Sequence, residues 1–267
     1  MGGPIGLGAT SNIFLGQVEA PLLIKPYLSS MTRHELLIIM TVGMSTIAGS
    51  VMVVYTTMLF PIYGAGLIGH FLSASLISVP AAIMYSNIML PSDVKTDFPD
   101  KSSNELYASV MDAITQGTKN GLDIFLNVIA MLIVVMALVF LVNSILSLFP
   151  PLFGDPITLE LLLGYLFAPL AWFMGISWEE SIIAGQLLGV KTALNEFVAY
   201  LYLADTETYQ LSDKSRLIML YALCGFANFS SVGILLSGLS AMIPERRMDL
   251  ISVSGKALWG ALLASCL

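Results

Sequence analysis

Long apolar segments recur along this chain and restrict how its backbone can fold. Apolar stretches of about 18 residues or more appear several times, and a bilayer core of about 30 Å needs about 20 helical residues to cross it. Inside lipid every backbone N–H and C=O group must find a partner within the protein, which favours helices. The composition agrees, because 57% of the residues are hydrophobic and 11% are charged, against about 25% charged in soluble domains. We therefore predict an all-α polytopic membrane protein.

Two carboxylates lie in segments that lipid would otherwise bury, and each precedes a helix that its own sequence breaks. Glu19 lies in GQVEAP at 16–21, and Glu196 follows an asparagine in a second apolar segment. The breaks are expected at 46–50 and 225–231. An ionised side chain at mid-membrane costs roughly 2.5–3.5 kcal/mol on insertion scales, so it is rarely without a role. The recurrence predicts inverted repeats that meet around one polar site, a pattern typical of transporters.

The same features divide the chain into elements within one transport region, 1–267. We predict two re-entrant helical hairpins, at 1–31 and 178–203, and two discontinuous transmembrane helices, at 33–59 and 217–242. Carbonyl groups freed at a helix break can bind a cation, while the N-termini of half-helices favour anionic or acceptor groups. The glycine-rich start and the apolar end predict that the chain is part of a larger membrane protein.

Several classes of function are disfavoured. The net charge of −7 argues against nucleic-acid binding, which needs a clustered basic surface. Cys224 and Cys266 lie in apolar segments and are expected to be packing residues. His34 and His70 are too far apart for a metal-ligand motif. Neither a phosphate-binding loop nor a nucleophile–base pair stands out, so we predict that the chain is not an enzyme and has no cofactor.

The carboxylates also have structural interpretations, which the sequence leaves open. Gln17 and Glu19 could merely cap the helix ends of their own hairpin. Glu196 could pair with Lys191 as a buried structural ion pair, which is about as plausible as direct ligand binding.

The residues of the breaks have structural interpretations too. Asn228, Ser230 and Ser231 could simply join packed membrane helices by hydrogen bonds. Thr46 could bond back to a carbonyl of its own helix and bend it. Phe226 would usually be a core residue, although its ring could also stack on a planar ligand.

Four motifs, taken in order, closely resemble those of the concentrative nucleoside transporters. They are GQVEAPL at 16–22, STIAGSV at 45–51, NEFVAY at 195–200 and CGFANFSS at 224–231. The resemblance extends over essentially the whole chain. It implies two re-entrant hairpins and two discontinuous helices around a mid-membrane nucleoside site, in a homotrimer of the cell membrane. It also implies symport of nucleosides into the cell, driven by Na⁺ or H⁺. Family members carry additional N-terminal helices that this chain lacks.

The resemblance also assigns residues to the substrate. Two polar residues of the first hairpin would address the nucleobase, two apolar residues of the breaks would pack on it, and three polar residues near the second break would hold the ribose. The implied substrate residues are Gln17, Val18, Glu19, Val51, Glu196, Phe226, Asn228 and Ser231. Val18 stands where many members have a hydroxyl residue, which removes a possible hydrogen bond to the base.

The coupling cation would lie, by the same resemblance, between the first hairpin and the first broken helix. Its implied ligands are Asn12, Leu15, Thr46 and Ile47. Backbone carbonyls would supply part of this shell, which suits the two apolar residues. Thr46 stands in place of a serine and keeps the oxygen atom but adds a methyl group.

Chemistry supports the ribose assignment independently. A carboxylate can accept hydrogen bonds from two vicinal hydroxyls, and an asparagine offers both a donor and an acceptor. Two alternatives remain. One is a symporter for another neutral polar solute, since the site carries carboxylates and little positive charge. The other is an uncoupled channel or receptor.

Overall fold

The computed structural model describes residues 2–92, 96, 108–151 and 156–267, and the elements in these parts of the chain are all helices. The all-α prediction is therefore confirmed for the described residues. In the first half the helices are α1 (Gly3–Ser11), α2 (Glu19–Leu23), α3 (Lys25–Leu28), α4 (Arg33–Ser45), α5 (Gly49–Tyr63), α6 (Leu67–Met89) and α7 (Val110–Leu146). In the second half they are α8 (Leu159–Phe173), α9 (Trp178–Ala193), α10 (Glu196–Ala204), α11 (Asp213–Ala222), α12 (Phe229–Met242), the 3₁₀ turn η1 (Pro244–Arg246) and α13 (Arg247–Ser265).

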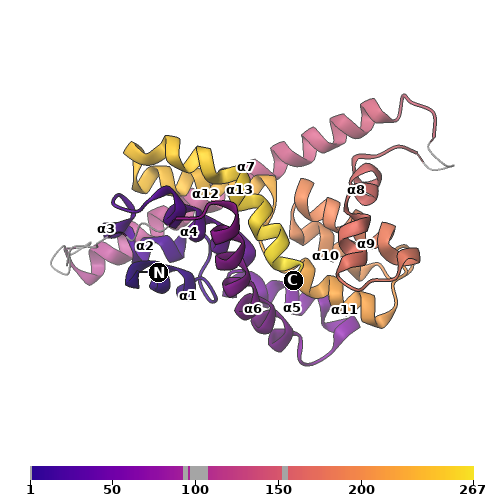
Figure 1. Cartoon of the computed structure of the whole chain (residues 1–267), viewed down its shortest axis with the longest axis horizontal. Coiled ribbons are helices and arrows are strands. Elements are labelled where there is room, and N and C mark those ends of the chain that lie inside the picture. The colour runs from indigo at the N-terminus through magenta and orange to yellow at the C-terminus, as the bar shows by residue number, and fades with distance from the viewer. Residues whose placement is uncertain (1, 93–95, 97–107, 152–155) are drawn as a thin grey trace.

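The helix α4 is buried along almost its whole length. Every residue from His34 to Ser45 is buried, and α4 packs against α6 and α13, which lie beside it in Figure 1. A helix that is apolar on all sides must be enclosed by protein or lipid. Its start is fixed by a capping box, in which the Thr32 hydroxyl accepts from the Glu35 N–H and the Glu35 carboxylate accepts from the Thr32 N–H.

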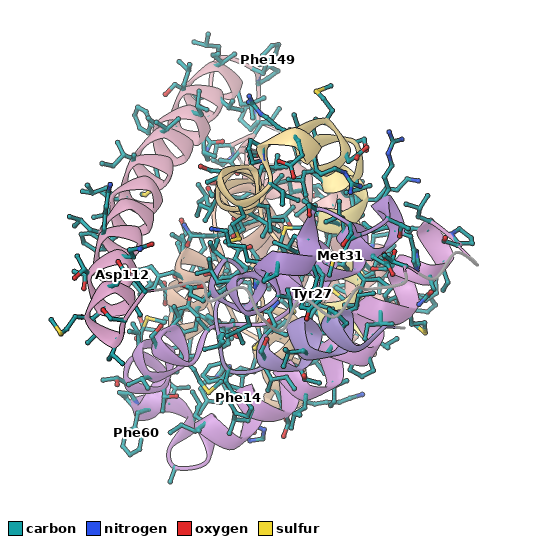
Figure 2. The ribbon with its side chains drawn as sticks, turned by 90° about the vertical axis from the view of Figure 1, so that its left-hand side faces the viewer. Phe14, Tyr27, Met31, Phe60, Asp112 and Phe149 are labelled. Carbon is teal, nitrogen blue, oxygen red and sulfur yellow. The ribbon has the colours of Figure 1, made fainter. Side chains whose placement is uncertain are left out.

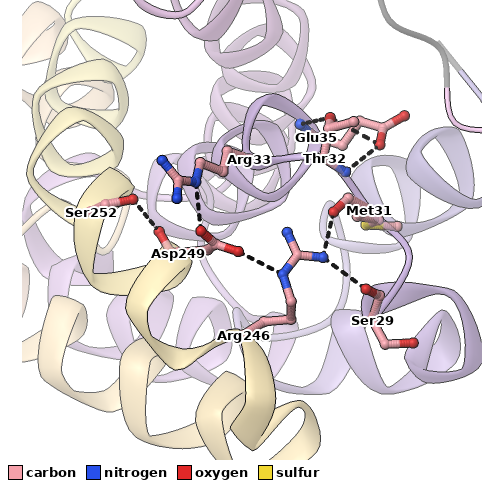
Figure 3. Close-up of polar contacts among 8 residues, drawn as sticks. All are labelled: Ser29, Met31, Thr32, Arg33, Glu35, Arg246, Asp249 and Ser252. Carbon is pink, nitrogen blue, oxygen red and sulfur yellow. Dashed lines mark hydrogen bonds and ion pairs between the residues drawn. The ribbon is translucent and has the colours of Figure 1, made fainter.

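An arginine ties the end of the first hairpin to the start of α13 (Figure 3). The Arg246 guanidinium donates to the carbonyl oxygens of Ser29 and Met31, both at 2.7 Å, and to Asp249 at 2.6 Å. Arg33, the first residue of α4, donates to the same Asp249 carboxylate at 2.5 Å. The forked donor geometry of arginine suits this role, because it can satisfy several acceptors at once.

Small residues allow the helices α8 and α9 to pack closely. A Cβ atom at Gly185 would overlap the carbonyl oxygen of Gly164, so the two backbones are in direct contact. Stripes of small residues are common where membrane helices pack. This contact holds the first arm of the second hairpin against α8.

The helix α7 differs from the others because it is largely exposed. Figure 2 shows it along one edge of the molecule, from Asp112 near one end to Phe149 just beyond the other. Apolar side chains such as Ile133 and Phe140 are 64% and 74% exposed. A surface of this kind suits a lipid environment better than water.

Two units are long and apolar enough to cross a membrane within the described residues. They are the α4–α5 unit, Arg33–Tyr63, with a mean hydropathy of 2.1, and α6, with 1.8. The α4–α5 unit is interrupted at 46–48, where Thr46 and Ala48 adopt extended backbone conformations. The second interruption separates α11 from α12 at 223–228.

The boundaries of three predicted segments differ from the helices found. The first broken helix continues past residue 59 to Tyr63, since Pro61 is accommodated inside α5. The second begins at Asp213 and not at 217, because the Ser212 hydroxyl caps it by accepting from the Ser215 N–H. The second arm of the first hairpin is divided at Ile24 into α2 and α3.

Candidate functional site

The turns of the two hairpins and the two helix breaks surround one cavity of about 550 Å³. Small-molecule sites usually have about 300–1,000 Å³. All eight residues that the family resemblance assigned to the substrate line this cavity: Gln17, Val18, Glu19, Val51, Glu196, Phe226, Asn228 and Ser231. They come from segments as distant as 17–19 and 226–231, so only the fold brings them together.

Glu196 is buried at one side of the cavity and is 6% exposed. It is the first residue of α10, whose N-terminus is capped by the Asn195 side chain accepting from the Val198 N–H at 2.9 Å. The N-terminus of a helix favours a negative charge. The Glu196 carboxylate accepts from the Tyr55 hydroxyl at 2.8 Å and from the Asn228 amide at 2.9 Å. Each carboxylate oxygen therefore has one partner and retains capacity for another.

Asn228 joins Glu196 to the second break. Its side-chain oxygen accepts from the Ser231 N–H at 2.7 Å and caps α12, while its side-chain nitrogen donates to Glu196. The N-termini of the half-helices α10 and α12 thus meet at the same carboxylate. The structural alternative for Asn228 is partly right, since the residue does link two helices, but it does so at the cavity wall.

Two buried polar atoms at the cavity have no hydrogen-bond partner. They are Oε1 of Gln17 and Oγ of Ser230. Burying such an atom without a partner costs about 1–3 kcal/mol, so an unpaired atom on a residue that lines a cavity suits a polar ligand. The alternative that Gln17 caps a helix end is not what the structure has, because the N-cap of α2 is Val18 and no side chain caps it.

The residues on either side of Gln17 at the turn differ in exposure. Val18 is 5% exposed and packs so closely on α12 that a Cβ at Gly238 would lie 2.8 Å from it. Glu19, the first residue of α2, is exposed where it lines the cavity. The carboxylate of Glu19 is therefore solvated, in contrast to the buried carboxylate of Glu196.

Apolar side chains form the remaining wall of the cavity. Val51 and Phe226 face it from the two breaks, and Phe125 faces it from α7. Aromatic rings of this kind can pack against the flat face of a ligand. The cavity thus combines a polar end around Glu196 with apolar surfaces.

The four residues assigned to a cation lie where the first hairpin meets the first break. Asn12, Thr46 and Ile47 are at most 1% exposed. With its amide oriented as the surrounding donors and acceptors require, Asn12 donates from its nitrogen to the carbonyl oxygens of Leu15 and Gly16 at 3.1 and 3.2 Å, and its oxygen accepts from the Gly43 N–H at 3.0 Å. The Leu15 side chain is 37% exposed, so this residue contributes its backbone to the cluster.

A rotation of the Asn12 amide would turn these contacts into a set of oxygen ligands. Turned by 180°, the amide would place its oxygen beside the carbonyls of Leu15 and Gly16, and such amide orientations are assigned from hydrogen bonding. Oxygen atoms, backbone and side-chain amide carbonyls among them, are the ligands that hard cations prefer. Thr46, which follows α4 at the first break, adds a hydroxyl, which donates to the Val42 carbonyl at 3.2 Å. The donor set therefore fits a small hard cation.

Close backbone contacts join the two breaks to each other and to the first hairpin. The Gly49 N–H, at the start of α5, donates to the carbonyl of Phe14 at 3.0 Å. Gly225 has φ of 137°, and a Cβ atom there would lie 2.7 Å from the carbonyl oxygen of Ser45. Only glycine adopts this conformation readily. The four residues assigned to a cation and the cavity are thus parts of one packed unit.

Lys191 and Glu196 do not form the buried ion pair that the sequence left open as one alternative. The Lys191 ammonium donates instead to the carbonyl of Ala222 at 2.8 Å and to the hydroxyl of Ser265 at 2.7 Å. Glu196 is satisfied by Tyr55 and Asn228, and the two ion pairs found among the described residues both involve Asp249. The two buried charged groups are therefore each hydrogen-bonded by separate neutral partners.

Sequence reasoning missed Tyr55, the hydroxyl donor to Glu196. Its ring lies 4.9 Å from that of Tyr200 and 6.3 Å from that of Phe71, and this aromatic cluster holds the hydroxyl in place. Tyr55 stands four residues after Val51 and so shares its helix face. That spacing was the available signal, but nothing in the sequence shows which long-range partner the tyrosine meets.

The amino-acid sequence of this chain is similar to those of known membrane transporters. Residues 70–267 match the family model described as Na⁺ dependent nucleoside transporter C-terminus. The chain is 41% identical to the uncharacterized transporter YutK of Bacillus subtilis, covering 98% of this chain and 64% of YutK. It is 37% identical to the nucleoside permease NupC of Helicobacter pylori, covering 94% of this chain and 60% of NupC. The chain thus spans less than two thirds of the length of these relatives.

A solved structure agrees with the fold. The structure of CNTnw in an inward-facing substrate-bound state superposes with a TM-score of 0.81, at 36% sequence identity, covering 97% of this chain and 61% of that one. The matched proteins are transporters and not enzymes.

Proposed function

The chain belongs to the Na⁺-dependent nucleoside transporter family, and we propose that it forms the part of a membrane transporter that binds a nucleoside and a coupling cation. The transporter would carry nucleosides into the cell by symport with Na⁺ or H⁺. The observation that carries this proposal is the buried Glu196 carboxylate, which faces a cavity with one acceptor position left on each oxygen.

The ribose end of the substrate would bind at Glu196. Vicinal hydroxyls of a ribose can donate to the two carboxylate oxygens, while the Ser231 hydroxyl can bond the same diol. Tyr55 and Asn228 hold the carboxylate in one orientation through the bonds at 2.8 and 2.9 Å. Prepositioned charged acceptors in a site sheltered from water give stronger hydrogen bonds than exposed ones.

The nucleobase would lie toward the first hairpin. The unpaired Oε1 of Gln17 can accept from an N–H on the base edge, and the exposed Glu19 can contribute through water. Val51 and Phe226 would cover the ring faces. Because Val18 is packed on Gly238 and offers no hydroxyl, discrimination among bases would depend chiefly on Gln17.

The cation would bind beside the substrate, at the oxygen atoms of Asn12, Leu15 and Thr46 with the backbone of Ile47. The contact between Gly225 and Ser45 connects this cluster to the break that carries Asn228. Ordering of the first break by a cation would therefore favour the arrangement that binds the nucleoside. The cation is cargo, and it supplies the driving force for transport.

The energy available from one cation suffices for accumulation. One elementary charge crossing 100 mV releases about 2.3 kcal/mol, which corresponds to roughly fifty-fold accumulation of a neutral substrate. Both hairpins and the two broken helices would move together against the rest of the protein to give alternating access. In this arrangement the hairpins are re-entrant, the repeats are inverted and the protein crosses the cell membrane several times, as a homotrimer in lipid.

Calorimetry of uridine binding to the purified full-length protein tests the proposal, with sodium or choline as the cation at a fixed pH. We expect binding that is stronger in sodium, because the cation orders the first break. Equal binding in both buffers would keep the nucleoside site and assign the coupling to protons. Absence of binding in both buffers would refute the nucleoside assignment and favour another neutral polar solute.

Counterflow in proteoliposomes distinguishes symport from an uncoupled channel or receptor. Vesicles loaded with unlabelled uridine should take up labelled uridine transiently above its equilibrium level, since a carrier exchanges substrate across the membrane. A channel equilibrates the label without this overshoot. A simple approach to equilibrium would therefore contradict the proposed carrier mechanism.

A further inference from the structure

A buried lysine outside the substrate cavity has no role in the function described so far. Lys191 lies in the last turn of α9 and is 0% exposed. An ammonium group in a medium of low dielectric constant is costly unless it is paired. Its nitrogen donates to the carbonyl of Ala222 and to the hydroxyl of Ser265, and among the described residues no carboxylate lies within ion-pair distance of it.

The position of its acceptor gives the reason for this burial. Ala222 is the last residue of α11, where the second break begins. The last carbonyls of a helix carry the negative end of the helix dipole, and a cation placed there is stabilised. A second carbonyl at the same end, that of Leu220, accepts from the Tyr200 hydroxyl at 2.8 Å. The second hairpin, α9–α10, therefore satisfies the end of α11 with one ammonium and one hydroxyl.

The corresponding end of α4, at the first break, has no such cation. There the hydroxyls of Ser45 and Thr46 both donate to the Val42 carbonyl, and no lysine or arginine bonds this end in the part of the chain that the structure describes. The first hairpin brings Asn12 and the carbonyls of Leu15 and Gly16 to this position. Among the described residues, the groups that hydrogen-bond at the first break are thus neutral, whereas a fixed positive charge bonds the end of α11 at the second.

We propose that the Lys191 ammonium is a tethered cation that stabilises the second break, as the coupling ion would stabilise the first break. It neutralises the end of α11 and holds α9 against it, so the second break does not need an ion from solution. One cation is then taken up with each nucleoside, although the two breaks are built alike. This inference rests on the proposed function.

A small cation has a route to this position if the lysine is shortened. A cavity of about 480 Å³ is lined by both acceptors of Lys191, Ala222 and Ser265. In Lys191→Ala the ammonium is removed and space is left behind, so a soluble cation can enter. In Lys191→Met the charge is removed but an unbranched side chain of similar length still fills the space. These two variants form a matched pair that separates charge from packing.

The experiment measures uridine affinity and its sodium dependence in the full-length protein. Loss of the ammonium at the buried end of α11 should weaken uridine binding by roughly tenfold to thirtyfold in both variants. Methylammonium should restore binding by Lys191→Ala but not by Lys191→Met. The sodium dependence of Lys191→Ala should also steepen, from a Hill coefficient of about 1 toward about 2. Lys191→Arg should retain most of the affinity.

Two results would overturn the inference. One is wild-type affinity and sodium dependence in both variants. The other is a folded Lys191→Ala protein whose weakened binding responds to neither methylammonium nor sodium. If the variants do not fold, the ratio of charge to uridine taken up by the wild type decides: one charge per uridine supports the inference and two contradict it. Failure of the wild type to bind uridine would instead refute the proposed function.

Discussion

The two helix breaks touch each other at Gly225 and Ser45, but their surroundings differ in charge. The first break lies against the amide of Asn12 and backbone carbonyls, all of them neutral. The second lies between a buried carboxylate, Glu196, and a buried ammonium, Lys191. Two helix breaks of similar sequence pattern can thus have different bonding partners, because the hairpin that precedes each break supplies different side chains.

The largest expected effect is at Glu196. In Glu196→Gln an amide nitrogen would face one of the two donors, Tyr55 or Asn228, and neither ribose hydroxyl would have a charged acceptor. Hydrogen bonds to charged groups are worth about 1.5–3 kcal/mol each, so we expect uridine affinity to fall at least roughly 100-fold and uptake to be abolished. Calorimetry and uptake in proteoliposomes measure both.

Glu179→Gln is the matched control, since Glu179 is exposed in the first turn of the same hairpin. It should bind uridine as the wild type does. Near-normal uptake by Glu196→Gln would contradict the ribose assignment and leave Glu196 with a structural role.

A smaller effect, on both thermal stability and ligand binding, is expected for a substitution where the two breaks meet. Gly225→Ala would place a Cβ atom 2.7 Å from the Ser45 carbonyl oxygen at a φ of 137°. Such strain costs of order 1–3 kcal/mol, and each kcal/mol lowers the melting temperature of a protein of this size by about 2–4 °C. Thermal unfolding in detergent should therefore show a lower midpoint, and both uridine and sodium binding should weaken.

Gly255→Ala serves as the control here, because a Cβ atom at Gly255 in α13 meets nothing within 4 Å. Alanine in an open helix position should be neutral or slightly stabilising. An unchanged midpoint for Gly225→Ala would mean that the breaks tolerate separation, contrary to the coupling described above.

The first break is probed by Thr46→Val, which removes a hydroxyl and keeps the volume. If a cation binds there, sodium affinity should fall by about tenfold, the equivalent of about 1.4 kcal/mol. Uridine affinity at saturating sodium should stay close to the wild-type value. Sodium titrations of uridine binding give both quantities.

Thr57→Val removes a hydroxyl with the same type of bond, to the carbonyl four residues earlier, from an exposed position on α5. Its sodium affinity should be unchanged. Equal sodium affinities for Thr46→Val and wild type would remove Thr46 from the cation site.

The smallest effect is expected at Tyr55. Tyr55→Phe removes the donor that lies 2.8 Å from Glu196 but leaves the bond from Asn228, so uridine affinity should fall by roughly threefold to tenfold. Tyr63→Phe is a suitable comparison, because the Tyr63 hydroxyl makes only a long 3.5 Å contact outside the cavity. A loss as large as that of Glu196→Gln would mean that Tyr55 contacts the substrate directly.

The apolar segments and the polar, glycine-containing motifs that interrupt them located the broken helices in the sequence. The exact ends of the helices depended on local contacts. The end of α4 at Ser45 and the start of α5 at Gly49 fall within the motif at 45–51. By contrast, the start of α11 at Asp213 depends on the Ser212 cap. Helix ends of this kind are set by single side chains and are difficult to place from an apolar pattern.

The sequence by itself determined the all-helical class, because hydrophobic runs are a local property, and its motifs assigned the residues that line one cavity through their resemblance to a known family. Only the tertiary structure decided the partners of those residues. In the structure the Tyr55 hydroxyl donates to Glu196, and Oε1 of Gln17 has no partner. The Lys191 ammonium donates to the Ala222 carbonyl and not to the carboxylate of Glu196, five residues away. These choices follow from how helices pack, which sets the distances between groups that lie far apart in the chain.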